Sequence, residues 1–281
     1  MLQTDTHLGP VAGVATSLLW TVTALLFTAA GRRISPTLVN GSRIYFGIVL
    51  LAITHRLLAG AWLPHATPGQ VALLLASGVI GLSFGDQALF TAFVEIGPRL
   101  SMLIMTTSPL FAVAFGWVVL GERLPGVALL GIGLTVGGVA WVVLERQPVG
   151  ADVLGGRRAR GVLLAFVAAA CQAGGLLLSK QGMGHGWLTE DQHMTPQAAT
   201  LVRMLGAGIG VLPLLWWHET RSRGARAGVR TSCRRSRRTG YALAACGAFV
   251  GPYLGVWMSL VAADLTDVGI AQTLCSLAPI F

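Results

Sequence analysis

Long apolar runs alternate with short polar segments along most of the 281-residue chain. A helix needs about 20 mostly apolar residues to cross the hydrocarbon core of a bilayer. The pattern therefore predicts about nine membrane helices, the last of which begins close to the end of the sequence. Their predicted ranges are 10–30, 36–58, 70–93, 100–120, 127–144, 161–179, 196–217, 240–262 and 268–281. The fold class that we predict is all-α, a polytopic bundle of membrane helices.

One stretch of this pattern occurs twice. Residues 81–111 read GLSFGDQALFTAFVEIGPRLSMLIMTTSPLF, and residues 251–281 read GPYLGVWMSLVAADLTDVGIAQTLCSLAPIF. The two stretches align without a gap, from their first glycines to their last phenylalanines. Both are apolar enough to form two membrane helices joined by a short turn. Internal duplication of this kind is how many transporters are built.

A second match lies in the second predicted helix of each half. Arg43 follows Pro36 by seven residues, and Arg203 follows Pro196 by seven residues. The matches divide the chain into a first repeat (1–146, helices one to five), a linker (147–160) and a second repeat (161–281). Five crossings per half is an odd number, so the second half must insert upside down relative to the first.

The second repeat is shorter than the first. The first repeat continues for 33 residues from Phe111 to Leu144, whereas the matching Phe281 is the last residue of the sequence. We therefore expect the second repeat to be truncated within the ninth helix, without a tenth.

The composition favours a membrane protein. Hydrophobic residues make up 54% of the chain and charged residues 11%, against roughly 25% charged residues in a soluble domain. The net charge of +9 raises the question of nucleic acid, but eight arginines lie between Arg221 and Arg238 and most others flank apolar runs. Basic flanks are typical of bilayer proteins, so we expect the partners to be the lipid bilayer and a small-molecule substrate, and no nucleic acid.

Motifs for catalysis are missing from the sequence. It has no phosphate-binding loop of the GxxxxGK type, no HExxH metalloprotease motif and no nucleophile elbow. The four cysteines form no CxxC pair, and we interpret them as unpaired packing residues: Cys171, Cys233, Cys246 and Cys275. We therefore predict neither an enzyme nor a bound cofactor.

Three short segments resemble a known family. They are Arg43–Gly47 (RIYFG), Ser108–Phe111 (SPLF) and Leu120–Leu124 (LGERL) before a glycine-rich fifth helix. With the duplication, they make the chain similar to the EamA-type transporters of the drug/metabolite transporter (DMT) superfamily. The second Gly-Glu-Arg turn and the tenth helix of that family are absent here. The resemblance implies a carrier of a small organic metabolite, with a central cavity lined mainly by helices one, three, four, six, eight and nine.

The basic residues are distributed unevenly between the loops. The loops after helices one, three, five and seven hold 15 of the 20 Lys and Arg residues, while the N-terminus and the other loops hold three. The positive-inside rule then places the N-terminus outside, whereas the family resemblance implies that it is inside. We expect a multi-pass integral protein of a bacterial inner (plasma) membrane.

Asp86 lies within the third predicted helix, beside Gln87. A carboxylate at bilayer depth costs several kcal/mol unless it is paired or hydrated, so it usually faces a cavity. The functional interpretation is a group that binds a proton or a cationic substrate. The alternative is that the helix begins later and Asp86 lies near the membrane interface.

Arg43 and Arg203 lie about 10 Å into their helices, given a rise of about 1.5 Å for each residue after the proline. Either could bind an anionic substrate. We favour a structural role instead, in which each side chain snorkels to the headgroups and fixes the depth of its helix.

Pro109 and Pro279 are expected to kink their helices and free backbone carbonyls that a cavity or a neighbouring helix must satisfy. Polar and aromatic side chains in the helices expected to line the cavity are candidate substrate contacts, although ordinary helix packing explains any one of them equally well. The candidates besides Asp86 and Gln87 are Trp20, Thr106, Ser108, Gln172, Tyr253, Trp257, Gln272 and Ser276.

His185 and His193 lie near Glu190 and Asp191 in a polar segment. These residue types can bind a metal, but a hydrated loop explains them more simply, and we predict no metal site.

The function that we predict is transport of a small organic metabolite or drug-like solute by alternating access, as an exporter driven by a proton gradient or the solute's own gradient. The alternative is a truncated membrane remnant or an interaction subunit that transports nothing.

Overall fold

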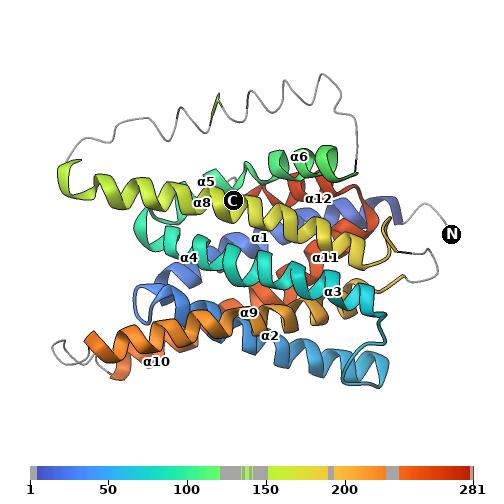
Figure 1. Cartoon of the computed structure of the whole chain (residues 1–281), viewed down its shortest axis with the longest axis horizontal. Helices are drawn as coiled ribbons and strands as arrows, with labels where there is room; N and C mark the ends of the chain where they lie inside the picture. Colours follow the sequence, from blue (N-terminus) through green and yellow to red (C-terminus); the bar gives the residue numbers. More distant parts are fainter. Residues whose placement is uncertain are drawn as a thin grey trace.

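The computed structural model of the chain describes residues 5–120, 151–188, 193–225, 234–278 and 281, together with 134, 137, 138 and 141. Every regular element in these ranges is a helix, and the helices form one elongated bundle (Figure 1). In chain order they are α1 (Asp5–Gly31), α2 (Pro36–Ala59), α3 (Pro68–Ser77), η1 (Gly78–Gly85), α4 (Asp86–Glu95), α5 (Pro98–Met105), α6 (Ser108–Leu120), α8 (Ala151–Gly182), α9 (Pro196–Ala225), α10 (Arg234–Ala248), η3 (Phe249–Gly255), α11 (Val256–Leu265) and α12 (Val268–Cys275). The predicted all-α fold class is confirmed.

Seven helices among the described residues are long and apolar enough to cross a membrane. They cover Leu8–Gly31, Pro36–Ala59, Pro68–Glu95, Pro98–Val118, Gly156–Gly182, Pro196–Thr220 and Ser236–Leu265. Each corresponds to one of the predicted helices, and together they confirm a multi-pass membrane protein. The predicted helix 127–144 lies outside the described residues apart from isolated positions. The ninth predicted helix is present as α12, whose eight residues are too few to span a bilayer.

Several helices extend further than we predicted; α10, for example, begins at Arg234 rather than at residue 240. Helix α8 begins at Ala151, so much of the predicted linker 147–160 is helical, and α9 continues from the predicted end at Trp217 to Ala225. Both extensions are rich in arginine, which is a good helix former. The apolar pattern marks only the part of a helix that lies in lipid, and it therefore missed these polar continuations.

Several helix starts follow from local sequence. Proline suits the first helical position because its missing N–H needs no partner there, and proline begins four of the spans: Pro36, Pro68, Pro98 and Pro196. Thr67 forms a capping box with Gln70 ahead of α3. Gly97 has a φ of 83°, which only glycine adopts without strain, and it turns the chain between α4 and α5.

The third and eighth predicted helices each contain a π-helical segment, η1 in one and η3 in the other. The two segments end at Gly85 and Gly255, which are matched positions of the duplicated stretch. A π-helical turn widens the backbone and is frequent at functional sites. The apolar pattern alone could not distinguish these segments from ordinary α-helix.

Each half of the chain contacts the other half through corresponding helices. Helix α1 packs against α10, η3, α11 and α12, while α8 packs against α3, η1, α4, α5 and α6. The first helix of each half therefore packs against the third and fourth helices of the other half. The second helices, α2 and α9, pack against each other, as Figure 1 shows near its lower edge.

Helix α9 lies very close to the span of α3 and η1. A side chain at Gly78 would collide with the backbone of Arg203, and one at Gly206 would collide with the backbone of Leu75. Ser83 Oγ donates a hydrogen bond of 2.8 Å to the carbonyl of Ala207 across the same seam. Small residues at this seam let the backbones touch, as membrane helices commonly do.

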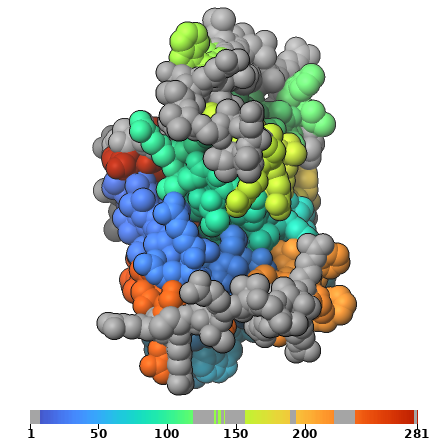
Figure 2. Space-filling model, turned by 90° about the vertical axis from the view of Figure 1, so that its left-hand side faces the viewer, coloured from blue at the N-terminus to red at the C-terminus, as the bar shows by residue number. Residues whose placement is uncertain are grey.

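Residues far apart in sequence meet at each end of the bundle. At one end, Ser35 lies 3.2 Å from the ring of His218 near the end of α9, and Gly240 of α10 packs on Ile34. Figure 2 shows this end, with the blue α1 and α2 beside the orange α9 and α10. At the other end, Gly9 of α1 packs on Thr266, just after α11. The end of α1, the last part of α9 and the start of α10 thus share one end of the molecule.

Candidate functional site

A cavity of about 70 Å³ lies inside the bundle, between elements of both halves. Its walls come from α1, α2, η1, α4 and α5 of the first half and from α8, η3, α11 and the α12 region of the second. The resemblance implied these helices except α2, which adds Arg43. Ligand pockets usually have volumes of about 300–1,000 Å³. The cavity in this structure is therefore smaller than a site that holds a solute of metabolite size.

The cavity is mostly apolar and aromatic, with a few polar groups. Its aromatic members are Trp20, Phe27, Phe90 and Phe93. The polar and charged side chains that line it are Thr23, Arg43, Asp86, Gln172, Gln272 and Ser276. An apolar chamber with a few polar groups is the usual form of a site that binds a small organic molecule.

The charged centre of the cavity is an ion pair between Arg43 of α2 and Asp86 at the start of α4. Only 3% of the Arg43 side chain and 14% of the Asp86 side chain are exposed. Asp86 therefore lies inside the bundle and faces a cavity. The span that contains Asp86 begins at Pro68, so the helix does not begin later, as the interfacial alternative supposed, and the role of Asp86 stays a prediction.

Further contacts hold Arg43 in place. Its Nε and Nη2 donate hydrogen bonds of 3.1 and 3.0 Å to Asn40 Oδ1, and Nη2 also donates one of 2.9 Å to the carbonyl of Leu82. The guanidinium carbon lies 4.9 Å from the ring centre of Phe90 and 5.9 Å from that of Phe27, within the range of cation–π attraction. The cation is thus enclosed by a carboxylate, an amide, a carbonyl and two rings.

Our snorkelling interpretation of the two helix arginines is wrong. Arg43 is 2% exposed and Arg203 1% exposed, so protein encloses both side chains and neither extends along the outside of its helix. Burial is possible for Arg43 because Asp86 supplies the opposite charge inside the bundle. The partner lies 43 residues away in the sequence, and the apolar pattern gives no signal of which helix faces would meet.

Arg203 has very different surroundings from Arg43. Its Nη2 lies beside two glycines, 2.9 Å from where a Cβ of Gly81 would be and 3.2 Å from that of Gly175. Its Nε and Nη2 have no hydrogen-bond partner among the described residues, and neither has the buried Oε1 of Gln172. Both groups border Gly81, with Gln172 on the cavity side. Arg203 therefore lies directly behind the cavity wall.

Gln272, a predicted contact residue, joins three helices at the cavity wall. Its Nε2 donates a hydrogen bond of 2.9 Å to Ser108 Oγ, which in turn donates one of 2.9 Å to the carbonyl of Ala169 in α8. Ser108 does not line the cavity and serves this packing network. Helix α5 stops at Met105, just before Pro109, where we predicted a kink. Pro279 lies outside the described residues.

The structure divides the other predicted site residues. Trp20, Asp86, Gln172, Gln272 and Ser276 line the cavity; Gln87, Thr106, Ser108, Tyr253 and Trp257 do not. Gln87 Nε2 donates a hydrogen bond of 3.1 Å to Thr37, and the hydroxyls of Tyr253 and Thr54 lie 2.9 Å apart.

Sequence reasoning also missed part of the wall. The residues not anticipated there include five large aromatic or sulfur-containing ones: Phe27, Phe90, Phe93, Met102 and Met105. An apolar residue of a membrane helix can face lipid, a neighbouring helix or a cavity, and all three environments give the same apolar sequence pattern. The sequence therefore carries no signal that distinguishes residues of the cavity wall from the others.

The comparison with known families agrees with this architecture. The model of the EamA-like transporter family matches residues 7–144 and 159–281, so it covers both halves of the chain. No curated protein sequence shows significant similarity to the chain. The family match covers nearly the whole sequence in two segments, which correspond to the two halves of the bundle. The chain therefore belongs to the EamA-like transporter family, a group of membrane transporters within the drug/metabolite transporter superfamily.

Proposed function

We propose that the chain carries a small organic solute across the membrane by alternating access, and that the cavity around Arg43 and Asp86 is its binding site. The observation that carries this proposal is a buried ion pair facing a cavity between the two halves. Charged groups inside membrane bundles are expensive and usually mark the pathway of a substrate or ion.

Three matched features support two inverted halves that move against each other. The first helix of each half packs on the third and fourth helices of the other half. The π-helical segments occupy corresponding places in the two halves. Arg43 and Arg203 stand at equal distances from the prolines that begin their helices. Inverted repeats with the binding site at their interface are typical of secondary transporters.

The ion pair suggests the substrate class. A proton or a cationic group that reaches Asp86 competes with Arg43 for the carboxylate. Phe27 and Phe90, whose faces already lie near the guanidinium, offer the same attraction to an organic cation. The rest of the wall is mostly apolar, and its other polar side chains are Thr23, Gln172, Gln272 and Ser276. We infer a small amphipathic solute with a cationic group, which exchanges with a proton on Asp86.

We propose that the direction of transport is export. The sequence has no phosphate-binding loop, so a proton or solute gradient is the energy source that we propose. We further propose a bacterial inner membrane as the location. The uneven loop charges favour a cytoplasmic position for the end shown in Figure 2.

Transport by purified protein in liposomes tests this proposal. Ethidium, an organic cation, and leucine, a zwitterion, serve as probes, with a proton gradient of either sign. We expect ethidium to move faster than in empty liposomes and in response to the gradient. Asp86→Asn keeps the side-chain size and removes the charge, and we expect it to abolish the gradient dependence.

Asp267→Asn is the matched control, because this aspartate is exposed beyond the end of α11 and its side chain caps no helix. It should transport like the unmodified protein. Gradient-dependent transport by Asp86→Asn at the unmodified rate would refute the role of Asp86. A well-folded protein that moves neither probe would favour an interaction subunit over a carrier.

A further inference from the structure

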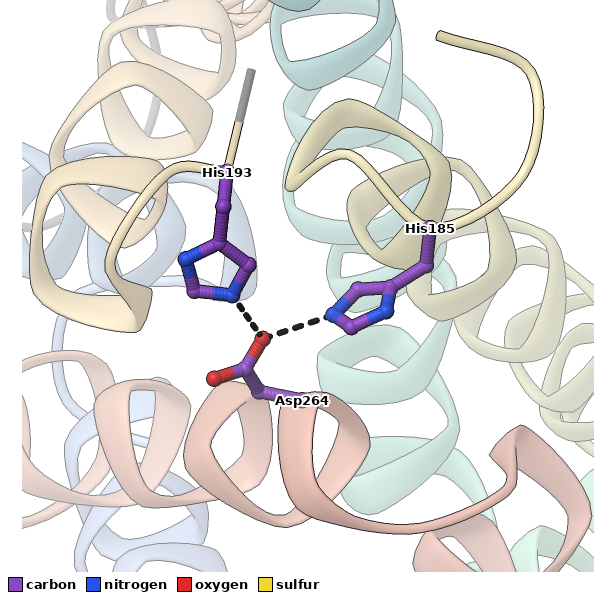
Figure 3. Close-up of side chains that lie close together, drawn as sticks. All are labelled: His185, His193 and Asp264. Carbon is purple, nitrogen blue, oxygen red and sulfur yellow. Dashed lines mark hydrogen bonds and ion pairs between the residues drawn. The ribbon is translucent and has the colours of Figure 1, made fainter. Parts of the chain in front are cut away.

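Two histidines and an aspartate converge at the end of the bundle opposite to that in Figure 2. His185 follows α8, His193 precedes α9, and Asp264 lies in the last turn of α11 (Figure 3). Oδ1 of Asp264 lies 2.8 Å from Nε2 of His185 and 3.0 Å from Nε2 of His193. The three potential ligand atoms all lie within 4.8 Å of one another.

Backbone contacts hold the two histidines close together. Gly184 and Gly186 flank His185 with φ values of 100° and 117°, a conformation that favours glycine and fixes a tight turn. The amide of Met194, next to His193, donates a hydrogen bond of 3.0 Å to the carbonyl of Met183. The two imidazole rings consequently lie 5.6 Å apart, at nearly a right angle.

The third group is held against the histidines by a separate contact. Lys180, in the last turn of α8, donates a hydrogen bond of 2.6 Å to the carbonyl of Thr266, two residues beyond Asp264. The end of α11 is therefore fixed next to the end of α8. The Asp264 carboxylate is 11% exposed, whereas His185 is 32% and His193 52% exposed, so an ion from solution can reach the group.

We propose that His185, His193 and Asp264 form a binding site for a divalent transition metal, with Zn²⁺ as its representative. Imidazole nitrogens suit zinc, copper, nickel and cobalt, whereas calcium and magnesium prefer an all-oxygen set. Two histidines and one carboxylate, with a water as fourth ligand, are a known zinc ligand set. Zinc bonds of about 2.0–2.2 Å require only small rotations of the three side chains, since their ligand atoms already converge.

The site would join the connection between α8 and α9 to the end of α11. Residues of α8 and α11 line the cavity, Gln172 from one and Val256 from the other. A bound ion would therefore restrain two cavity-lining helices at one end of the bundle. This consequence rests on the proposed carrier function, but metal binding itself does not.

Metal binding is measured directly on the full-length protein in detergent. After alkylation of the thiols, we expect equilibrium dialysis to give one Zn²⁺ per chain. His185→Ala, His193→Ala and Asp264→Asn should each weaken binding by about tenfold or more, because even an outer-shell partner of a metal ligand contributes that much. Co²⁺ should give the ligand-field absorption of a nitrogen and oxygen site, with no thiolate band.

His65→Ala is the matched control, because this histidine is exposed in the connection between α2 and α3. It should bind one Zn²⁺ with the affinity of the unmodified protein. Size-exclusion profiles of all variants, compared before metal is added, separate loss of binding from misfolding. Three results would refute the site: weak uptake of metal, uptake of more than one ion per chain, or equal uptake by the unmodified protein and the three variants. The convergence would then be a set of hydrogen bonds only.

Discussion

Arg43 and Arg203 occupy matched places in the two halves of the chain, yet among the described residues only Arg43 forms an ion pair. Arg43 is paired with Asp86 and lines the cavity. Arg203 lies behind the cavity wall, and two of its nitrogens have no hydrogen-bond partner among the described residues. In the gapless alignment of the duplicated stretches, the residue that matches Asp86 is Val256. The halves share a backbone plan, but only the first has the carboxylate.

On the function proposed above, the two halves have different roles. A carboxylate paired with an arginine can exchange that partner for a proton or a cation, so we propose that the first half provides the groups that switch. Arg203 instead fills the space beside Gly81 and Gly175, at the seam where α9, η1 and α8 meet. A buried cation without a carboxylate of its own contributes little to stability and can lower it.

Arg43 and Arg203 are equivalent positions only if the second half is an inverted copy of the first. Labelling of single cysteines gives an all-or-none test of this inversion. In a protein without its native cysteines, we would place one cysteine at Arg32, His65 or the native Cys233. The fold puts positions 32 and 65 at opposite ends of the bundle, and the inverted repeat puts 233 with 32. A membrane-impermeant maleimide applied to intact cells should therefore label either 65 alone or both 32 and 233.

The labelled side also decides between the two orientations of the N-terminus. Labelling of His65→Cys from outside would agree with the loop charges, because it places the arginine-rich end in the cytoplasm. Labelling of 65 and 233 from the same side would refute the inverted repeat in either orientation.

The next largest effect is expected from Arg43→Met. It leaves the Asp86 carboxylate buried without its partner, and breaking a buried pair in this way costs about 3–5 kcal/mol. The free energy of unfolding in mixed detergent micelles should fall by that amount. The double variant Arg43→Met with Asp86→Leu removes both charges, and it should recover most of the loss. A double variant as unstable as the single one would show that Arg43 stabilises the fold through Asn40 and the aromatic rings rather than through Asp86.

Much of this fold could be predicted from the sequence because lipid imposes a simple rule on each helix separately. Runs such as 36–58 and 196–217 mark helices that the structure confirms, and Asp86 stood out because a charge in such a run is unusual. This rule does not predict which faces of the helices pack against each other. Arg43 and Asp86 are 43 residues apart, and His185 and Asp264 are 79 residues apart. Their meeting depends on how several helices pack, which an apolar pattern in one helix does not specify.

The smallest effect, and the most direct test of the asymmetry, is expected from Arg203→Met. The substitution is the same as in the first half, but it leaves no carboxylate unpaired, since Asp86 keeps Arg43. Methionine fills a similar volume and removes a buried cation whose Nε and Nη2 have no hydrogen-bond partner in the part of the chain that the structure describes. Replacing buried charge by apolar packing is often neutral or stabilising, so the free energy of unfolding should change by no more than about 1 kcal/mol. The same unfolding assay in mixed micelles measures it beside Arg43→Met. A loss as large as that of Arg43→Met would mean that Asp86 serves both arginines equally, and the distinction between the halves would then fail.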